Sequence, residues 1–288
     1  MKKFVLIIIT LFILLISSGC YNYKEINDMA IVSSIGIDKD NKNDKYIVSA
    51  QIMNSKESED SEDSQITVYT KEGDTVHEAL RNTTLESPKK LYVGHLESII
   101  ISERIAKSNI SELFDFILRD PEITKDANIL MIKDASINEV MSIITPLESI
   151  PAESIKSSIE VASKIQGSVN NIPFDEFAAT IIETGIDPVI PLITIKENKS
   201  DNKEVNPEKR IVMSKELAMF SREKFVGYLN RDAAFGYNIA LNNVNENVIS
   251  FKCDKNNYAS IELVNNNSKL SYDVSKNTLS IKSTIVGS

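Results

Sequence analysis

The sequence of 288 residues has no tryptophan, only nine glycines, two cysteines and two histidines. Two cysteines and two histidines leave almost nothing from which to build a zinc site, and they make a disulfide scaffold unfavourable as well. Nine scattered glycines do not supply the glycine-rich loop that cradles a phosphate group. These shortages argue against a zinc enzyme, a nucleotide-binding enzyme and a disulfide-rich domain.

Basic residues are also in the minority. The sequence has 32 Lys and Arg against 41 Asp and Glu, which gives a net charge of −9, and it shows no basic stripe. An acidic chain of this kind is not attracted to phosphates, so we expect no nucleic-acid partner. Hydrophobic residues make up 42% and charged residues 25% of the chain, which is ordinary globular usage.

The first twenty residues have the pattern of a lipoprotein signal. Lys2 and Lys3 precede an uncharged apolar run over 4–16, and Ser-Ser-Gly then leads directly to Cys20. The apolar run forms a helix of about 20 Å, which is too short for a bilayer core of about 30 Å. The pattern predicts a signal peptide at 1–19 and a diacylglyceryl group on Cys20. A plain signal peptide and an uncleaved anchor are the alternatives. Because Cys20 is then consumed, Cys253 has no partner, and we interpret it as a small, half-buried strand residue.

Hydrophobic periodicity predicts an α+β fold of more than one domain, with antiparallel and mixed sheets and helices packed on one side. In the first part of the chain, strands are expected at 31–37, 46–52, 65–70, 96–101, 127–132 and 187–195, and helices at 75–83, 110–118, 136–144, 155–165 and 173–181. In the last part, we expect a hairpin of 217–220 with 224–229, a helix at 232–241, and strands at 248–251, 258–264, 270–274 and 279–285.

Composition suggests where the domains begin and end. We expect an N-terminal α+β region at 20–195, an exposed, charged and Asn-rich linker at 196–210, and a β-rich C-terminal domain at 211–288. The N-terminal region can be divided further into subdomains at about 20–56 and 65–195, since the acidic run at 55–64 is typical of a solvated loop. That run lacks the alternating Asp or Asn, the central Gly and the distal Glu of a calcium loop.

No motif for catalysis, cofactor binding or metal binding is found. His77 begins the run His-Glu-Ala-Leu-Arg, in which Arg81 stands where a zinc-protease helix needs its second histidine. We therefore interpret His77 as a surface residue. His95 precedes an apolar strand, and we interpret it as a structural histidine, with a binding role as the alternative. The sequence predicts no catalytic, cofactor or metal site, which favours an interaction or binding protein.

Five segments, at 20–38, 87–103, 118–123, 185–191 and 225–230, occur in an order and with residues that resemble a known family, the Ger(x)C lipoproteins, which are the C subunits of spore germinant receptors. The lipidated Cys20 is followed by an aromatic residue, Tyr21, where the family more often has Trp, and then by Glu-Ile-Asn-Asp. Because family members usually extend further, the resemblance also implies that the C-terminal domain is incomplete.

The resemblance implies a non-enzymatic lipoprotein on the outer surface of the spore inner membrane. In that family the protein assembles with two membrane-embedded subunits, A and B, and is needed for germination in response to nutrients. Only Cys20 is carried over as a functional residue, because small-molecule sensing in the family is attributed mainly to the B subunit. A solute-binding lipoprotein of an envelope transporter is the alternative, and it requires two α/β lobes around a cleft. An envelope enzyme is a third hypothesis.

Overall fold

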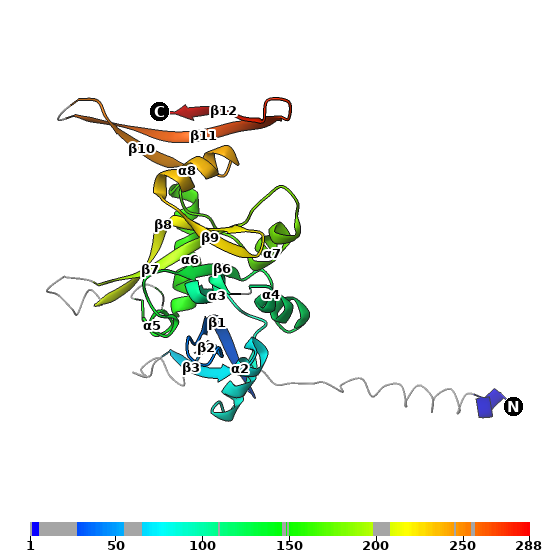
Figure 1. The fold of residues 1–288 in the computed structure, drawn as a ribbon. Helices are drawn as coiled ribbons and strands as arrows, with labels where there is room; N and C mark the ends of the chain where they lie inside the picture. Colours follow the sequence, from blue (N-terminus) through cyan, green and yellow to red (C-terminus); the bar gives the residue numbers. More distant parts are fainter. Residues whose placement is uncertain are drawn as a thin grey trace.

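A computed structural model shows the chain as two β-sheets with helices packed on them (Figure 1). The predicted signal peptide beyond residue 5, the predicted lipid-attachment residue Cys20, the acidic run at 55–64 and most of the predicted linker lie outside the described residues. The residues that the structure describes are 2–5, 28–54, 65–108, 110–145, 148, 150–197, 208–244, 246–254 and 257–288.

The larger sheet has nine strands and is mixed. Its strands are β1 (Met29–Lys39), β2 (Tyr46–Met53), β3 (Ile66–Gly73), β4 (Lys90–Tyr92), β5 (Ser98–Ser102), β6 (Asn128–Ile132), β7 (Val189–Glu197), β8 (Lys209–Ser221) and β9 (Lys224–Leu229). They lie in the order β3-β2-β1-β5-β6-β7-β8-β9, and β4 pairs with the start of β1. Strands β1, β5, β6 and β7 run parallel, and antiparallel strands flank them on both sides. The predicted α+β class with a mixed sheet is therefore confirmed.

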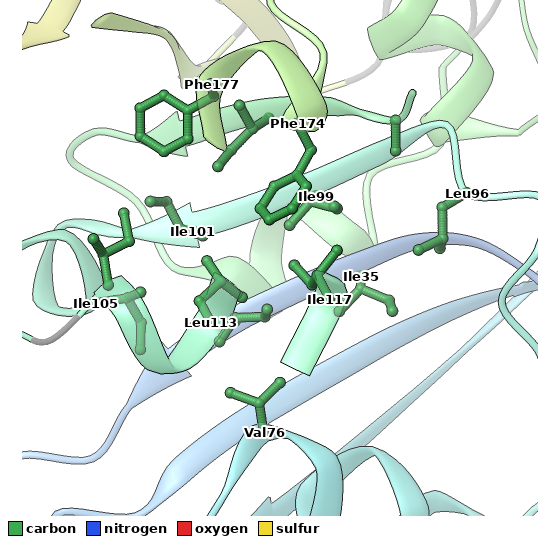
Figure 2. Packing of buried hydrophobic residues seen from close by; sticks show 14 of the residues in the cluster. Ile35, Val76, Leu96, Ile99, Ile101, Ile105, Leu113, Ile117, Phe174 and Phe177 are labelled. Atoms are coloured by element: carbon green, nitrogen blue, oxygen red, sulfur yellow. The ribbon is translucent and has the colours of Figure 1, made fainter. Parts of the chain in front are cut away.

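Helices cover both faces of this sheet, rather than one face as predicted. The helices are α2 (Val76–Asn82), the 3-10 helix η2 (Thr83–Leu85), α3 (Glu103–Lys107), α4 (Ile110–Arg119), α5 (Ile137–Met141), α6 (Pro151–Ile165), α7 (Phe174–Ile182) and α8 (Arg231–Ala240). Side chains alternate along β5, so Ile99 and Ile101 join the core under α2, α3, α4 and α7, whereas Ile100 joins the core under α5 and α6 (Figure 2). A central parallel strand is buried on both faces, and it requires cover on both.

The second sheet has three antiparallel strands, in the order β10 (Asn247–Lys252), β11 (Tyr258–Asp273) and β12 (Thr278–Gly287). It lies beyond α8, at the end of the molecule opposite β1, β2 and β3 (Figure 1). β11 is one continuous strand, so the prediction of two separate strands over 258–264 and 270–274 is wrong. Helix α8 connects the sheets in sequence and packs on β8 and on β11.

The linker predicted at 196–210 connects two strands that pair with each other. β7 and β8 are antiparallel neighbours, with Val189 opposite Met219 and Glu197 opposite Lys209. Strands β8 and β9, which belong to the range predicted as the C-terminal domain, therefore complete the large sheet. The pairing of β2 with β3 likewise joins the ranges 20–56 and 65–195 in one sheet.

Candidate functional site

The described chain enters its fold at the start of β1, and this end of the sheet gathers segments that are distant in sequence. Met29–Ile31 of β1 pair in parallel with Lys90–Tyr92 of β4. The Lys90 ammonium donates to both carboxylate oxygens of Glu122, at 3.0 Å each. Three of the segments that resemble the Ger(x)C lipoproteins are thus neighbours here. Cys20 lies outside the described residues, and its lipid attachment stays a prediction.

A groove, which we call the α2–α4 groove, lies between α2 and the end of α4. It consists of two adjoining hollows of about 710 and 570 Å³, which share His77, Phe116, Asp120 and Pro121. The first hollow is also lined by Thr75, Val76, Ser111, Glu112, Asp115 and Arg119. The lining of the second includes Leu80, Arg81, Lys90, Leu91, Val93 and Glu122. Buried apolar side chains of the sheet's core, among them Val76 and Phe116, therefore form the floor of the groove.

Local sequence explains the wall formed by α2. The Thr75 hydroxyl accepts a hydrogen bond from the backbone N–H of Glu78 at 3.1 Å. The Glu78 carboxylate accepts in turn from the N–H of Asp74 at 2.8 Å. Thr75 therefore caps this helix at its N-terminus, and the glutamate reaches one residue further back than in the usual capping box.

The wall formed by α4 is amphipathic. Its buried side includes Leu113 and Phe114, and the exposed stripe of Glu112, Asp115 and Arg119 follows the helical spacing of i, i+3 and i+7. The apolar stripe fixes the helix on the sheet. The same packing places the charged stripe beside the groove. The spacing of these residues in the sequence, by itself, is that of a solvent-exposed helix face.

The rim of the groove has two carboxylates without a cationic partner among the described residues. Arg119 pairs with Asp115, and Lys90 pairs with Glu122. Glu112 accepts a hydrogen bond from the neutral Tyr46 hydroxyl, which leaves its charge in place. Asp120 accepts from the backbone N–H of Glu122 at 2.8 Å. Arg81, which lines the second hollow, is a cation without a carboxylate partner among the described residues, so the excess of negative charge lies in the first hollow, at Glu112 and Asp120.

Burial, followed by the hydrogen bond and the charge of Glu112, holds the pKa of the Tyr46 hydroxyl well above its usual value. The hydroxyl therefore stays protonated and keeps donating to the carboxylate near neutral pH. Tyr46 is only 4% exposed, so this contact joins the wall of the groove to β2.

His77 is exposed, as predicted, and it also belongs to the groove. Its ring meets Phe116 edge-on, with centroids 5.3 Å apart and planes at 66°. Nothing in the sequence around His77 indicates that Phe116 lies beside it, because the two residues belong to different helices.

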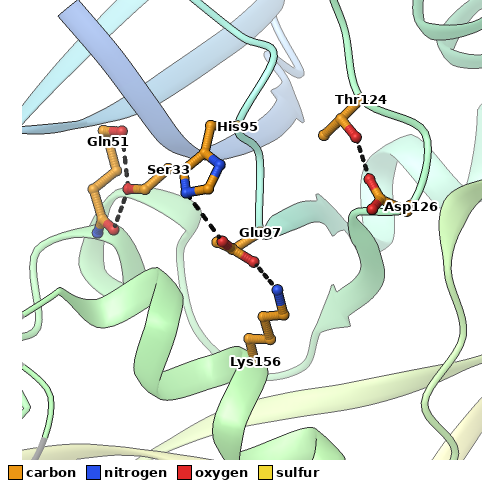
Figure 3. Close-up of polar contacts among 7 residues, drawn as sticks. All are labelled: Ser33, Gln51, His95, Glu97, Thr124, Asp126 and Lys156. Atoms are coloured by element: carbon orange, nitrogen blue, oxygen red, sulfur yellow. Dashed lines mark hydrogen bonds and ion pairs between the residues drawn. The ribbon is translucent and has the colours of Figure 1, made fainter.

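His95 has a polar partner, although its side chain is 58% exposed. Its Nε2 lies 3.5 Å from one Glu97 oxygen, and the other oxygen pairs with the Lys156 ammonium of α6 (Figure 3). The hydrogen bond that the Lys156 ammonium donates to Glu97 raises the pKa of Lys156, against a smaller opposing effect of burial. This contact ties α6 to the loop before β5, which fits the structural interpretation of His95.

A smaller hollow of about 320 Å³ lies at the carboxyl ends of β1, β5 and β6. Four of its five charged side chains form pairs with one another, and Asp134 is the fifth. Arg104 donates through Nε to Asp38 at 2.9 Å and forms a second contact with the same carboxylate, and Lys107 pairs with Glu103. These internal pairs leave little charge to recognise a ligand.

Within the described ranges, no group of three or more His, Cys, Asp or Glu side chains is placed to hold a metal ion. No helix in those ranges has the length and apolar character needed to cross a membrane. Cys253 is exposed and follows the end of β10, so its interpretation as a half-buried strand residue is wrong.

Comparison with known proteins identifies the family. Residues 22–195 match the family model described as spore germination protein N-terminal domain, and residues 215–286 match spore germination B3/GerAC like, C-terminal. Spore germination protein KC of Bacillus subtilis (strain 168) is 26% identical over 287 residues, which cover 93% of this chain and 70% of that protein. Putative spore germination protein YfkR of the same organism is 26% identical over 204 residues, 68% of this chain and 51% of that protein.

Among solved structures, the crystal structure of the GerBC protein aligns with a TM-score of 0.47 and 15% identity, over 88% of this chain and 70% of that one. The family models together span most of the sequence, in the order in which the sequence segments resemble the family. The chain therefore belongs to the Ger(x)C family of spore germination proteins.

Proposed function

We propose that the chain is a non-enzymatic lipoprotein subunit of a spore germinant receptor, needed for nutrient-triggered germination. It acts through contacts with the membrane-embedded A and B subunits, by binding one of their conformational states more tightly than another. The observation that carries this proposal is the match of both family models, over 22–195 and 215–286. The names of the two Bacillus subtilis relatives, which refer to spore germination, also support it.

The proposed location is the outer surface of the spore inner membrane, with a diacylglyceryl group on Cys20 as the anchor. Two acyl chains hold a protein firmly, since each buried methylene contributes about 0.8 kcal/mol. The body of the protein is acidic, so it is not drawn to anionic lipid by its own charge. About eight residues separate Cys20 from Asp28 and reach at most about 30 Å, which keeps the start of β1 close to the membrane.

A solute-binding lipoprotein is less well supported. That class needs two α/β lobes that enclose a cleft. The described residues form one continuous sheet from β3 to β9 and a small three-stranded sheet. In the hollow at the carboxyl ends of the parallel strands, four of the five charged side chains pair with one another.

The test replaces Cys20 by alanine in the spore-forming host. We expect Cys20→Ala to move the protein out of the membrane fraction and to abolish the germination response to the nutrient of this receptor. Cys253→Ala is the matched control, because Cys253 is the other cysteine and is exposed, and it should behave like the unmodified protein. A Cys20→Ala protein that stays fully membrane-bound and supports normal germination would refute the proposal.

A further inference from the structure

We propose that the α2–α4 groove binds a basic amphipathic helix of a membrane-embedded partner subunit. This inference rests on the proposed function, and it names the surface and the chemistry of the contact. The mode is that of a helix laid in a groove, with apolar side chains on the floor and cationic side chains at the rim.

The floor of the groove favours an apolar face on the partner. Phe116 is 9% exposed, Val76 is 3% exposed, and both line the first hollow. The two hollows of about 710 and 570 Å³ share residues of α2 and of the α4 end, so they form one elongated depression. Each has the volume of a typical binding cleft. The walls are helical faces that present side chains, which suits side-chain insertion by a helix.

The rim favours positive charge on the partner. Glu112 and Asp120 have no cationic partner among the described residues, whereas the cations Arg119 and Lys90 are already paired with Asp115 and Glu122. Glu112 lies in α4 and Asp120 directly follows this helix, so a lysine or arginine on the partner would meet both carboxylates along the same wall of the groove. Arg81 of the second hollow has no carboxylate partner among the described residues, so the preference for a cation belongs to the first hollow, where an acidic group would be repelled by Glu112 and Asp120.

The position of the groove favours a membrane-embedded partner over a soluble one. The second hollow is lined by Lys90 and Leu91 of β4, and β4 pairs with Met29–Ile31 at the start of β1. In the proposed anchoring, Cys20 lies about eight residues before this point. The lipid anchor therefore holds the groove near the membrane surface. Anchoring to the same membrane raises the effective concentration of the extramembrane segments of integral subunits at the groove.

The experiment is photocrosslinking of the full chain in spore inner membranes. A photoreactive benzoylphenylalanine replaces Ser111, a half-buried residue of the first hollow. We expect a crosslink to a membrane-embedded receptor subunit, with the crosslinked peptide rich in Lys or Arg when it is identified by mass spectrometry. A crosslink to a second copy of the chain, to lipid or to an acidic segment refutes the proposal, and so does the absence of any crosslink.

Charge variants test the chemistry. Glu112→Arg should lower the crosslinking yield about fivefold, the factor that corresponds to ~1 kcal/mol for an exposed ion pair. Glu112→Gln keeps the acceptor for Tyr46 and should give a smaller decrease. Glu176→Arg is the matched control, since Glu176 is also an exposed third residue of its helix, α7, and it should leave the yield unchanged. Equal yields for Glu112→Arg and the control refute the role of the rim charge.

The two proposals fail in different ways. A Cys20→Ala strain with normal germination overturns the proposed function. A Cys20→Ala strain that is defective, combined with Ser111 crosslinks that never reach a membrane-embedded subunit, leaves the proposed function standing and overturns the groove alone.

Discussion

The side chain of Gln51 on β2 connects the large sheet to both helices on one of its faces, and its removal should be costly. Gln51 is 1% exposed. Its Nε2 donates to the Met141 carbonyl at the end of α5, at 2.8 Å. Its Oε1 accepts from the Ala152 N–H at 3.1 Å and from the Ser33 hydroxyl at 3.2 Å (Figure 3). Because the N-cap residue of α6 makes no side-chain bond, Gln51 serves as the cap of that helix.

We expect Gln51→Leu to lower the free energy of unfolding by about 2–4 kcal/mol. The substitution leaves the Met141 carbonyl and the Ala152 N–H buried without their partner, and each loss costs about 1–3 kcal/mol. The added apolar surface offsets part of this cost. Ser33→Ala removes a single hydroxyl from the same cluster and should cost only about 1 kcal/mol.

The assay is urea unfolding of the mature chain carrying Cys20→Ala, followed by circular dichroism. A loss for Gln51→Leu that is no larger than the loss for Ser33→Ala would refute the reasoning, because it would mean that the two backbone groups find other partners at no cost.

Two further predictions concern packing and pH. A Cβ added at Gly36 would lie 2.2 Å from Cγ2 of Ile137. Gly36→Val should therefore displace α5 and lower the free energy of unfolding by about 1–3 kcal/mol in the same assay. Gly236→Ala is the control, because a Cβ added there meets nothing within 4 Å and should not destabilise the protein; equal unfolding midpoints for the two variants would contradict the prediction. The raised pKa of Tyr46 means that the unfolded chain loses this proton first as the pH rises above about 10, so stability should fall there. Tyr46→Phe should make that fall shallower, and an unchanged slope in unfolding measured from pH 9 to 11 would count against it.

Local patterns were sufficient to predict most elements of the fold. The strands predicted at 31–37 and 46–52 correspond to β1 and β2, and the helical spacing of Leu113, Phe114 and Ile117 predicted α4. The parallel centre of the sheet depends on pairing between strands far apart in sequence, such as Ser34 with Ser98, and local periodicity carries no information about it. The apolar character of β5 was evident from the sequence, but local periodicity did not show which helices cover each of its faces.

The break predicted within β11 has a specific cause. Asn266 and Ser268 are polar and lie in the gap between the strands predicted at 258–264 and 270–274. In the structure both side chains are buried and donate to the Ile239 carbonyl near the end of α8, each at 2.7 Å. A tertiary contact with the end of a helix thus explains why these two strand positions are polar, and sequence alone does not show that contact.

The groove was not predicted because each part of it has an ordinary local explanation. Glu112 and Arg119 have the spacing of a solvated helix face, and His77 has that of an exposed helical residue. Only the packing of α2 beside α4 places these groups around Phe116. The start of β1 and the groove lie at one end of the molecule, and β10–β12 lie at the other end (Figure 1). If Cys20 carries the lipid, only about eight residues separate the anchor from Asp28, just before β1. Contacts made close to the membrane then involve the groove rather than the C-terminal sheet, so rim variants should weaken assembly while equivalent charge changes on β12 should not.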